Sequence, residues 1–90
     1  MSRYVIRVLP PARRAIERGL PEKVAAAAVE FIYGALADNP QRVGKPLRDE
    51  LAGKWSARRG EYRVIYTVDA EIVTVEVLRI DHRRDVYRTD

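Results

Sequence analysis

The spacing of apolar residues changes once along the chain, and this change limits the folds that the sequence can adopt. Between residues 21 and 37, apolar residues such as Val24, Ala28 and Phe31 recur every three to four positions, which is typical of an amphipathic helix. From residue 53 onward, apolar and polar residues alternate, as they do in strands that expose one face. Helical segments followed by strands indicate an α+β domain.

Turn residues divide the chain into six predicted elements. Residues 3–9 have strand character and end at a pair of prolines, and a short helix over 12–19 stops at Gly19. Pro21 suits the first turn of the second helix. Three strands follow over 54–58, 61–68 and 71–80, with two-residue connections between them. We therefore predict the order β-α-α-β-β-β, with two helices packed on a small, largely antiparallel, twisted sheet.

Length and composition exclude several classes of protein. Ninety residues suffice for one domain with one core, and an apolar fraction of 47% argues against disorder. Without cysteine and with one histidine, neither disulfides nor a protein metal site is expected. The longest apolar stretch, residues 24–37, contains Glu30 and is shorter than the ~18–20 residues of a membrane span. We expect one soluble, cytoplasmic domain over residues 1–90, without a cofactor.

Positive charge is concentrated in the middle of the chain. Residues 41–66 hold seven cations and three anions, so this stretch accounts for the formal net charge of +4. Fourteen of the seventeen basic residues are arginines, whose planar fork binds phosphate with two hydrogen bonds and stacks on bases. The stretch is therefore either a surface for nucleic-acid phosphates or a solvated basic surface.

The predicted hairpins sort the side chains onto two faces. Two-residue loops would pair Arg58 with Glu61 and Val68 with Glu71. One face is then apolar and suits packing under the helices: Trp55, Ala57, Tyr62, Val64, Tyr66, Val68, Val73, Val75 and Val77. The other face carries the cations among polar and aliphatic residues: Lys54, Ser56, Arg58, Arg63, Ile65, Thr67, Thr74, Glu76, Leu78, Ile80 and His82. This register predicts that Lys54, Arg58, Arg63 and His82 lie on one side of one sheet.

Three features in combination resemble a known family. The strand sequence Gly60-Glu61-Tyr62-Arg63-Val64-Ile65-Tyr66 follows Gly44-Lys45-Pro46-Leu47 and Trp55, and the chain ends with Ile80-Asp81-His82-Arg83-Arg84-Asp85-Val86-Tyr87-Arg88. Together with the order of elements, these segments resemble the RelE/ParE toxins of bacterial type II toxin–antitoxin systems, over nearly the whole chain. The resemblance is to the RelE-like branch and implies the fold of a RelE-like microbial ribonuclease.

The resemblance implies a chemistry. Members of the RelE branch enter the ribosomal A site and cut messenger RNA without a metal ion. The 2′-hydroxyl attacks the adjacent phosphorus, a 2′,3′-cyclic phosphate forms and the 5′-oxygen leaves. This reaction needs a proton acceptor, cations that stabilise the phosphorane, and a proton donor for the leaving oxygen. The implied function is a ribosome-dependent messenger-RNA endoribonuclease that inhibits translation.

By position, the catalytic residues of the family fall on Arg63, Lys54, His82, Arg83 and Tyr87. Arg63 matches a phosphate-stabilising arginine, although a surface pair with Glu76 is the structural alternative. Lys54 matches a lysine that assists proton transfer or charge stabilisation, but the family's second lysine, two residues later, is Ser56 here.

The C-terminal candidates are open to two interpretations each. His82 suits proton exchange near neutral pH, or it is a strand-end histidine bound to a backbone carbonyl. Arg83 aligns with a second catalytic arginine of the family only across a small gap, and Arg84 is the alternative for that role. Tyr87 either stacks on the nucleotide or closes the core. The nuclease hypothesis loses its physical basis if Arg63 and His82 face away from each other. Five further residues are expected to bind RNA: Arg58, Arg59, Lys45, Arg84 and Arg88.

Two other functions are compatible with the same fold. A ParE-like toxin inhibits DNA gyrase through protein contacts, and a catalytically weak toxin acts mainly as an antitoxin-bound co-repressor. The family implies a cognate antitoxin, the ribosome and messenger RNA as partners, and a toxin–antitoxin assembly that binds operator DNA through the antitoxin. We expect an acidic antitoxin helix to cover Ile65, Leu78 and Ile80 on the basic face of the sheet.

Overall fold

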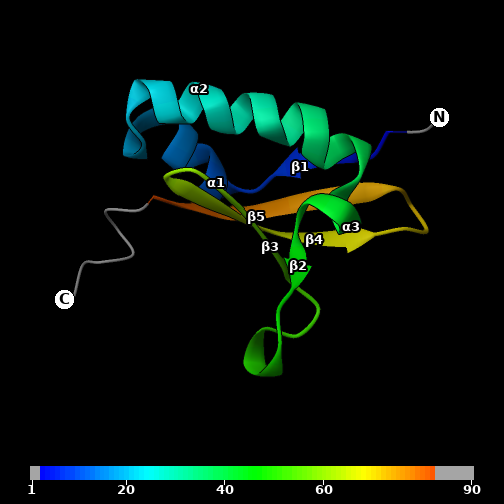
Figure 1. Ribbon diagram of the computed structural model, residues 1–90. Helices are drawn as coiled ribbons and strands as arrows, with labels where there is room; N and C mark the ends of the chain where they lie inside the picture. Colours follow the sequence, from blue (N-terminus) through cyan, green and yellow to red (C-terminus); the bar gives the residue numbers. More distant parts are fainter. Residues whose placement is uncertain (1–2, 83–90) are drawn as a thin grey trace.

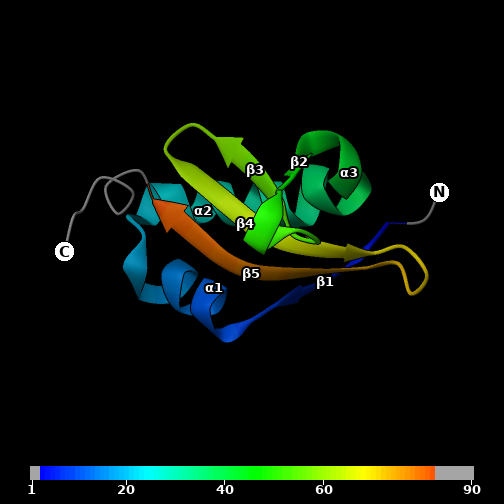
Figure 2. The same ribbon diagram turned by 90° about the horizontal axis from the view of Figure 1, so that it is seen from below.

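The computed structural model describes residues 3–82, and in it the helices cover one face of a five-stranded sheet (Figure 1). The strands are β1 (Val5–Val8), β2 (Lys45–Pro46), β3 (Trp55–Arg59), β4 (Tyr62–Asp69) and β5 (Thr74–His82). Their order across the sheet is β1-β5-β4-β3-β2 (Figure 2). β1 runs parallel to β5, and the other neighbours are antiparallel. The predicted α+β class is confirmed.

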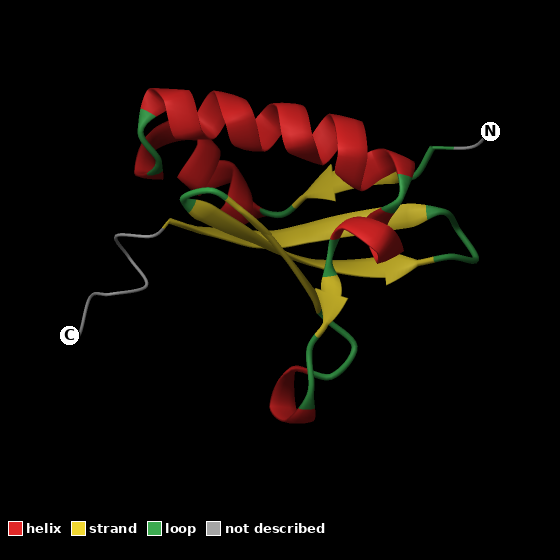
Figure 3. Cartoon of the chain, viewed as in Figure 1, coloured by secondary structure: helices red, strands yellow, loops and turns green. Residues whose placement is uncertain are grey.

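Two long helical segments form the second layer (Figure 3). α1 (Pro10–Arg14) continues as the π-helical segment η1 (Ala15–Gly19), and α2 (Glu22–Phe31) continues as the π-helical segment η2 (Ile32–Leu36). A proline begins α1, where its missing N–H costs no hydrogen bond. Both predicted helices are therefore confirmed, and the first begins two residues earlier than predicted.

The core lies between these two layers. Small residues such as Ala12 and Ala28 are completely buried, so the helices approach the sheet closely. From the sheet, Val64, Tyr66 and Val77 are completely buried beneath them. The apolar face predicted from alternation is the core face, with one exception. Val73 lies in the β4–β5 connection, outside the strand, with φ +48°.

The segment between η2 and β3 contains elements that the periodicity did not predict. α3 (Pro40–Val43) leads into β2, and a single 3-10 turn, η3 (Asp49–Leu51), precedes β3. These elements are two to four residues long, which is too short for a hydrophobic period to develop. They nevertheless form one side of the site described below.

Next to the turn of each hairpin, the predicted register is wrong by an even number of residues, which leaves the faces of the strands unchanged there. In the β3–β4 hairpin the loop is Gly60-Glu61, so Arg58 pairs with Arg63, and Gly60 has φ +51°. In the β4–β5 hairpin Val68 pairs with Val75. The second loop is longer because the Asp69 carboxylate accepts hydrogen bonds from the backbone N–H groups of residues 71 and 72.

A β-bulge at Leu78 reverses the faces at the end of β5. Tyr66 pairs with Val77 and Ile65 pairs with Arg79, so Leu78 is the extra residue. A regular strand would turn the Arg79 side chain into the core, whereas the bulge keeps it exposed and buries Ile80 instead. The predicted faces of Ile80 and His82 are therefore wrong, because these residues pair with Val64 and Tyr62 on the core face.

Candidate functional site

A groove of about 590 Å³ lies at the edge of the sheet where β2 ends. β2 pairs with only two residues of β3, so among the described residues no strand covers the edge of β3 from Ala57 to Arg59. Five cations line this groove, and we call it the basic groove: Arg42, Lys45, Arg58, Arg59 and Arg63. The other described residues that line it are uncharged. The groove therefore concentrates positive charge beside an open strand edge.

Two of these cations face each other directly. Arg58 and Arg63 are cross-strand partners in β3 and β4, and both point away from the helices because their neighbours Ala57 and Val64 are buried in the core. Like charges at directly opposite positions destabilise a sheet. A bound anion between the two guanidinium groups would relieve this repulsion, and phosphate has the geometry that arginine binds best.

The predicted structural alternative for Arg63 is not observed. Glu76 pairs with Arg7 at 3.3 Å, rather than with Arg63. The β5 neighbour of Arg63 is Asp81, and its carboxylate is 3.3 Å from Arg79. Within residues 3–82, none of the five groove cations forms an ion pair. Within that range, no carboxylate pairs with their charge.

The opposite wall of the groove comes from the short elements. Lys45 pairs with Ser56 between β2 and β3, and Arg42 lies in the last turn of α3. Lys45 is one of the RNA-binding candidates predicted from the sequence, and in the structure it lines the groove. Arg42 also lines the groove but is not one of the predicted candidates. Its only signal in the sequence is its place in the basic stretch, because α3 is too short to be recognised.

Arg59 has a second contact besides the groove. Its guanidinium carbon lies 4.6 Å from the centroid of the Phe31 ring in α2, and its Nη1 donates to the Arg58 carbonyl oxygen at 2.9 Å. A guanidinium over an aromatic face is a cation–π contact. Arg59 therefore also attaches the β3–β4 hairpin to the helix layer.

The remaining predicted site residues are outside the groove or outside the described residues. Lys54 precedes β3 and is half-buried, and its backbone exchanges hydrogen bonds with Leu51 and Leu47. It is not among the residues that line the groove. Four candidates lie beyond residue 82, where the structure is not described, and their roles stay predictions: Arg83, Arg84, Tyr87 and Arg88.

His82 does not share a face with Arg63, and that prediction is wrong. The histidine is only 4% exposed and pairs with Tyr62 on the helix side of the sheet. Its Nε2 is 3.5 Å from the Glu61 carboxylate and has no hydrogen-bond partner among the described residues. The bulge at Leu78 is the cause. The basic groove thus has no imidazole, and the nuclease hypothesis in the form that sets His82 beside Arg63 is wrong. A nuclease function of this chain would have to rest on the groove cations instead.

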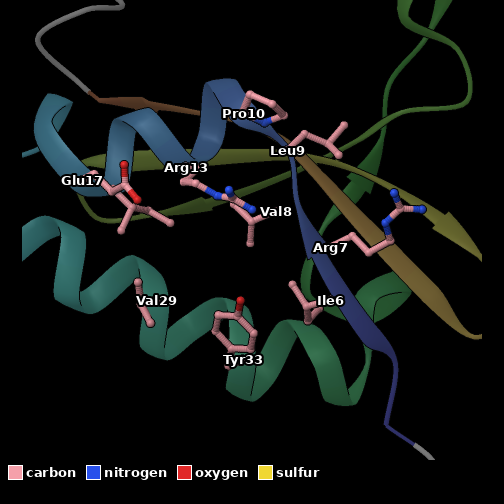
Figure 4. Close-up of a pocket in the computed structure, with 10 residues that line it drawn as sticks. Ile6, Arg7, Val8, Leu9, Pro10, Arg13, Glu17, Val29 and Tyr33 are labelled. Carbon is pink, nitrogen blue, oxygen red and sulfur yellow. The ribbon is translucent and has the colours of Figure 1, made fainter.

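A second groove, of about 580 Å³, lies between β1, α1 and α2 (Figure 4). Ile6 and Val8 of β1 face Tyr33 across it, and Arg13 and Glu17 lie at its rim. We call it the edge groove, because β1 is the outer strand of the sheet. The antitoxin surface predicted on the other face is wrong in part, since Ile80 belongs to the core and Ile65 is only 8% exposed.

The described residues contain neither a group of metal ligands nor a helix that could span a membrane. Within residues 3–82, no three His, Asp or Glu side chains are grouped as ligands of a metal ion. Over the same range, no helix has the length and apolar composition needed to span a membrane.

Comparisons with known proteins identify the family. The family model described as the ParE toxin of type II toxin–antitoxin systems matches residues 5–87. Toxin RelG of Mycobacterium tuberculosis is 54% identical over 94% of this chain and 97% of its own length. Toxin RelE of the same organism is 49% identical over 94% of this chain and 87% of its own length.

A solved structure agrees with these sequence matches. The toxin–antitoxin complex RelBE2 of Mycobacterium tuberculosis contains a chain with 53% identity and a TM-score of 0.86 to this one. The match covers 90% of this chain and 99% of that one. Taken with the helix-covered five-stranded sheet, these matches show that the chain belongs to the RelE/ParE toxins of type II toxin–antitoxin systems.

Proposed function

We propose that this toxin cleaves messenger RNA on the ribosome and binds the phosphates of the message in the basic groove. The observation that carries the proposal is the convergence of five cations from α3, β2, β3 and β4, with Arg58 directly opposite Arg63. Relatives named RelG and RelE, at 54% and 49% identity, favour the RelE branch over a ParE-like gyrase inhibitor.

In the proposed reaction, the arginines act on the charge that develops at phosphorus. As the 2′-oxygen attacks, two negative charges gather on the phosphorane oxygens, and the fixed guanidinium groups of Arg58 and Arg63 stabilise them. His82 takes no part, because it lies on the other face. The proposal assigns charge stabilisation to the groove cations. Lys54, the proton-transfer candidate of the family resemblance, does not line the groove, so its role stays a prediction. The ribosome supplies the alignment of the 2′-oxygen with the phosphate.

Programmed ribosomes distinguish the proposal from its alternatives. We expect the purified toxin to cut the message within the A-site codon and to leave a 2′,3′-cyclic phosphate, which primer extension and end analysis detect. Gyrase-dependent DNA breaks without message cleavage would support the ParE-like function. Neither activity, combined with tight antitoxin binding and operator repression, would support the co-repressor function.

RNA binding to the groove should depend steeply on salt concentration. A single strand that contacts four or five cations releases the corresponding counterions, so the slope of log K against log salt should be roughly −3. Fluorescence anisotropy with a short, unstructured oligoribonucleotide, between about 50 and 200 mM salt, measures it. Arg18→Ala is the control because Arg18 is exposed in η1, outside the groove. A wild-type slope close to zero would contradict groove binding.

The proposed antitoxin partner binds the edge groove. The toxin of the similar RelBE2 structure was solved in complex with its antitoxin. In this chain, the backbone N–H groups of Val5 and Leu9 point toward β5, so those of Ile6 and Val8 point to the open side of β1. An extended antitoxin segment can add a strand there and place apolar side chains in the groove.

Replacing Tyr33 with glutamate should weaken antitoxin binding by about tenfold or more, as expected for an aromatic contact at an interface. Tyr33 is 51% exposed, so the substitution should change the free energy of unfolding little. Isothermal titration with the cognate antitoxin measures the effect, and Tyr33→Phe is the matched control. If the glutamate variant binds the antitoxin with unchanged affinity, the antitoxin binds another surface of the toxin.

A further inference from the structure

We infer that Tyr66 and Gly44 are positioning residues for the basic groove. The buried tyrosine hydroxyl and the missing side chain at Gly44 together hold Arg42 and Lys45 opposite the Arg58–Arg63 pair. Neither Tyr66 nor Gly44 needs to touch the RNA. The inference rests on the proposed function, since it takes the basic groove as the RNA-binding surface.

The Tyr66 hydroxyl links the sheet to the start of α3. Its ring is completely buried on the core face of β4, and it stacks against Trp55 with 6.4 Å between ring centroids and 22° between planes. The hydroxyl donates a hydrogen bond of 2.6 Å to the carbonyl oxygen of Pro40, the first residue of α3. Burial raises the pKa of Tyr66 to about 12, so the hydroxyl keeps the proton that it donates.

Gly44 lies directly on this hydroxyl. A Cβ atom added at Gly44 would overlap the Tyr66 hydroxyl oxygen and lie 2.9 Å from the Ser56 carbonyl oxygen. The backbone at Gly44 is extended, with φ −132° and ψ −175°, a conformation open to any residue. Glycine is therefore required here because a side chain would not fit, and not because of the backbone conformation. The chain can pass from α3 to β2 only because residue 44 has no side chain.

The two walls of the groove depend on this contact in different ways. Arg42 precedes Gly44 by two residues and Lys45 follows it directly, so a displacement of Gly44 moves both. Arg58 and Arg63 are held by the β3–β4 ladder and stay in place. Crowding at Gly44 would therefore change the distance between the walls without changing any charge. Phosphates bound across the groove would lose the contacts from one wall.

The test combines Gly44→Ala, Tyr66→Phe and the double variant. Gly44→Ala should weaken RNA binding by about tenfold or more, and the slope against salt should fall in magnitude by about 1.4, as for two lost phosphate contacts. Tyr66→Phe should weaken binding less. The double variant should bind more tightly than Gly44→Ala, because the added Cβ then meets no hydroxyl oxygen. Recovery should be partial, since the contacts with the Ser56 carbonyl oxygen at 2.9 Å and with the Cζ ring carbon of residue 66 at 3.1 Å remain.

Two matched variants control for general effects on the fold. A Cβ at Gly34, in η2, would meet no atom within 4 Å apart from its chain neighbours and the backbone of its own helix. Gly34→Ala therefore tests the change from glycine to alanine without crowding. Tyr62→Phe removes another hydroxyl of β4, which donates to the Ala27 carbonyl oxygen at 3.3 Å, away from the basic groove. Both controls should keep the wild-type affinity and salt slope. Loss of folded protein lowers the active fraction but leaves the slope unchanged, so the slope separates positioning from stability.

The outcomes separate this inference from the proposed function. If Arg63→Ala weakens RNA binding while Gly44→Ala has wild-type affinity and slope, the positioning role is wrong and the groove still binds RNA. If the wild type binds RNA without salt dependence and Arg63→Ala changes nothing, the proposed function itself fails. Should Gly44→Ala not fold, Tyr66→Phe decides: an effect on RNA affinity no larger than that of Tyr62→Phe overturns the inference.

Discussion

Replacing Arg63 with alanine is expected to abolish message cleavage on programmed ribosomes and to relieve growth arrest. Arg63 is half-buried and lies directly opposite Arg58 in the basic groove. In the proposed mechanism its guanidinium stabilises the transition state more than the ground state. Loss of one such preorganised donor lowers a rate by roughly 10²–10³-fold. Single-turnover cleavage, with the variant in excess over ribosomes, measures the change.

Two comparisons make this result specific. Arg79→Ala removes an arginine from the same face of the sheet, but Arg79 is ion-paired with Asp81 at 3.3 Å and lies outside the groove lining, so cleavage should persist. Antitoxin binding to Arg63→Ala should also persist, because the edge groove and the basic groove lie at opposite edges of the sheet. A wild-type cleavage rate in Arg63→Ala would show that the catalytic role belongs elsewhere.

Truncating Ile80 to alanine should lower the free energy of unfolding by about 2–5 kcal/mol, the usual cost of such a cavity in a core. Ile80 is only 6% exposed and pairs with the completely buried Val64. Domains of this size are stable by about 5–15 kcal/mol, so the variant would lose a large share of its stability. Urea denaturation followed by circular dichroism measures the loss.

Leu78→Ala is the matched variant for the bulge. Leu78 is half-exposed, is the extra residue of β5 and is not part of the core cluster, so we expect a loss below about 1 kcal/mol. In a regular strand, residues 78 and 80 would lie on the same face and respond alike. Similar losses of unfolding free energy in Ile80→Ala and Leu78→Ala would therefore contradict the bulge. In that case His82 would lie on the same face of the sheet as Arg63.

The sequence alone determined the order of the main elements and which side of the sheet faces the core. Helical spacing around Ala28 and Phe31, followed by alternation around Val64 and Tyr66, is enough for this, because burial of one face is a local property of each segment. The sequence also predicted that Arg58 and Arg63 lie on one face of the sheet, since a shift of the register by two residues leaves both side chains on the same face.

Only the tertiary structure decided the register, the place of His82 and the second wall of the groove. A bulge depends on whether the packed core can accept Arg79 or Ile80, and no local pattern along β5 contains that information. Nor could spacing bring Arg42 opposite Arg58, because their approach depends on Gly44 fitting over the Tyr66 hydroxyl. Local periodicity therefore determines which face of an element is buried, whereas contacts between distant segments determine which side chains meet in the site.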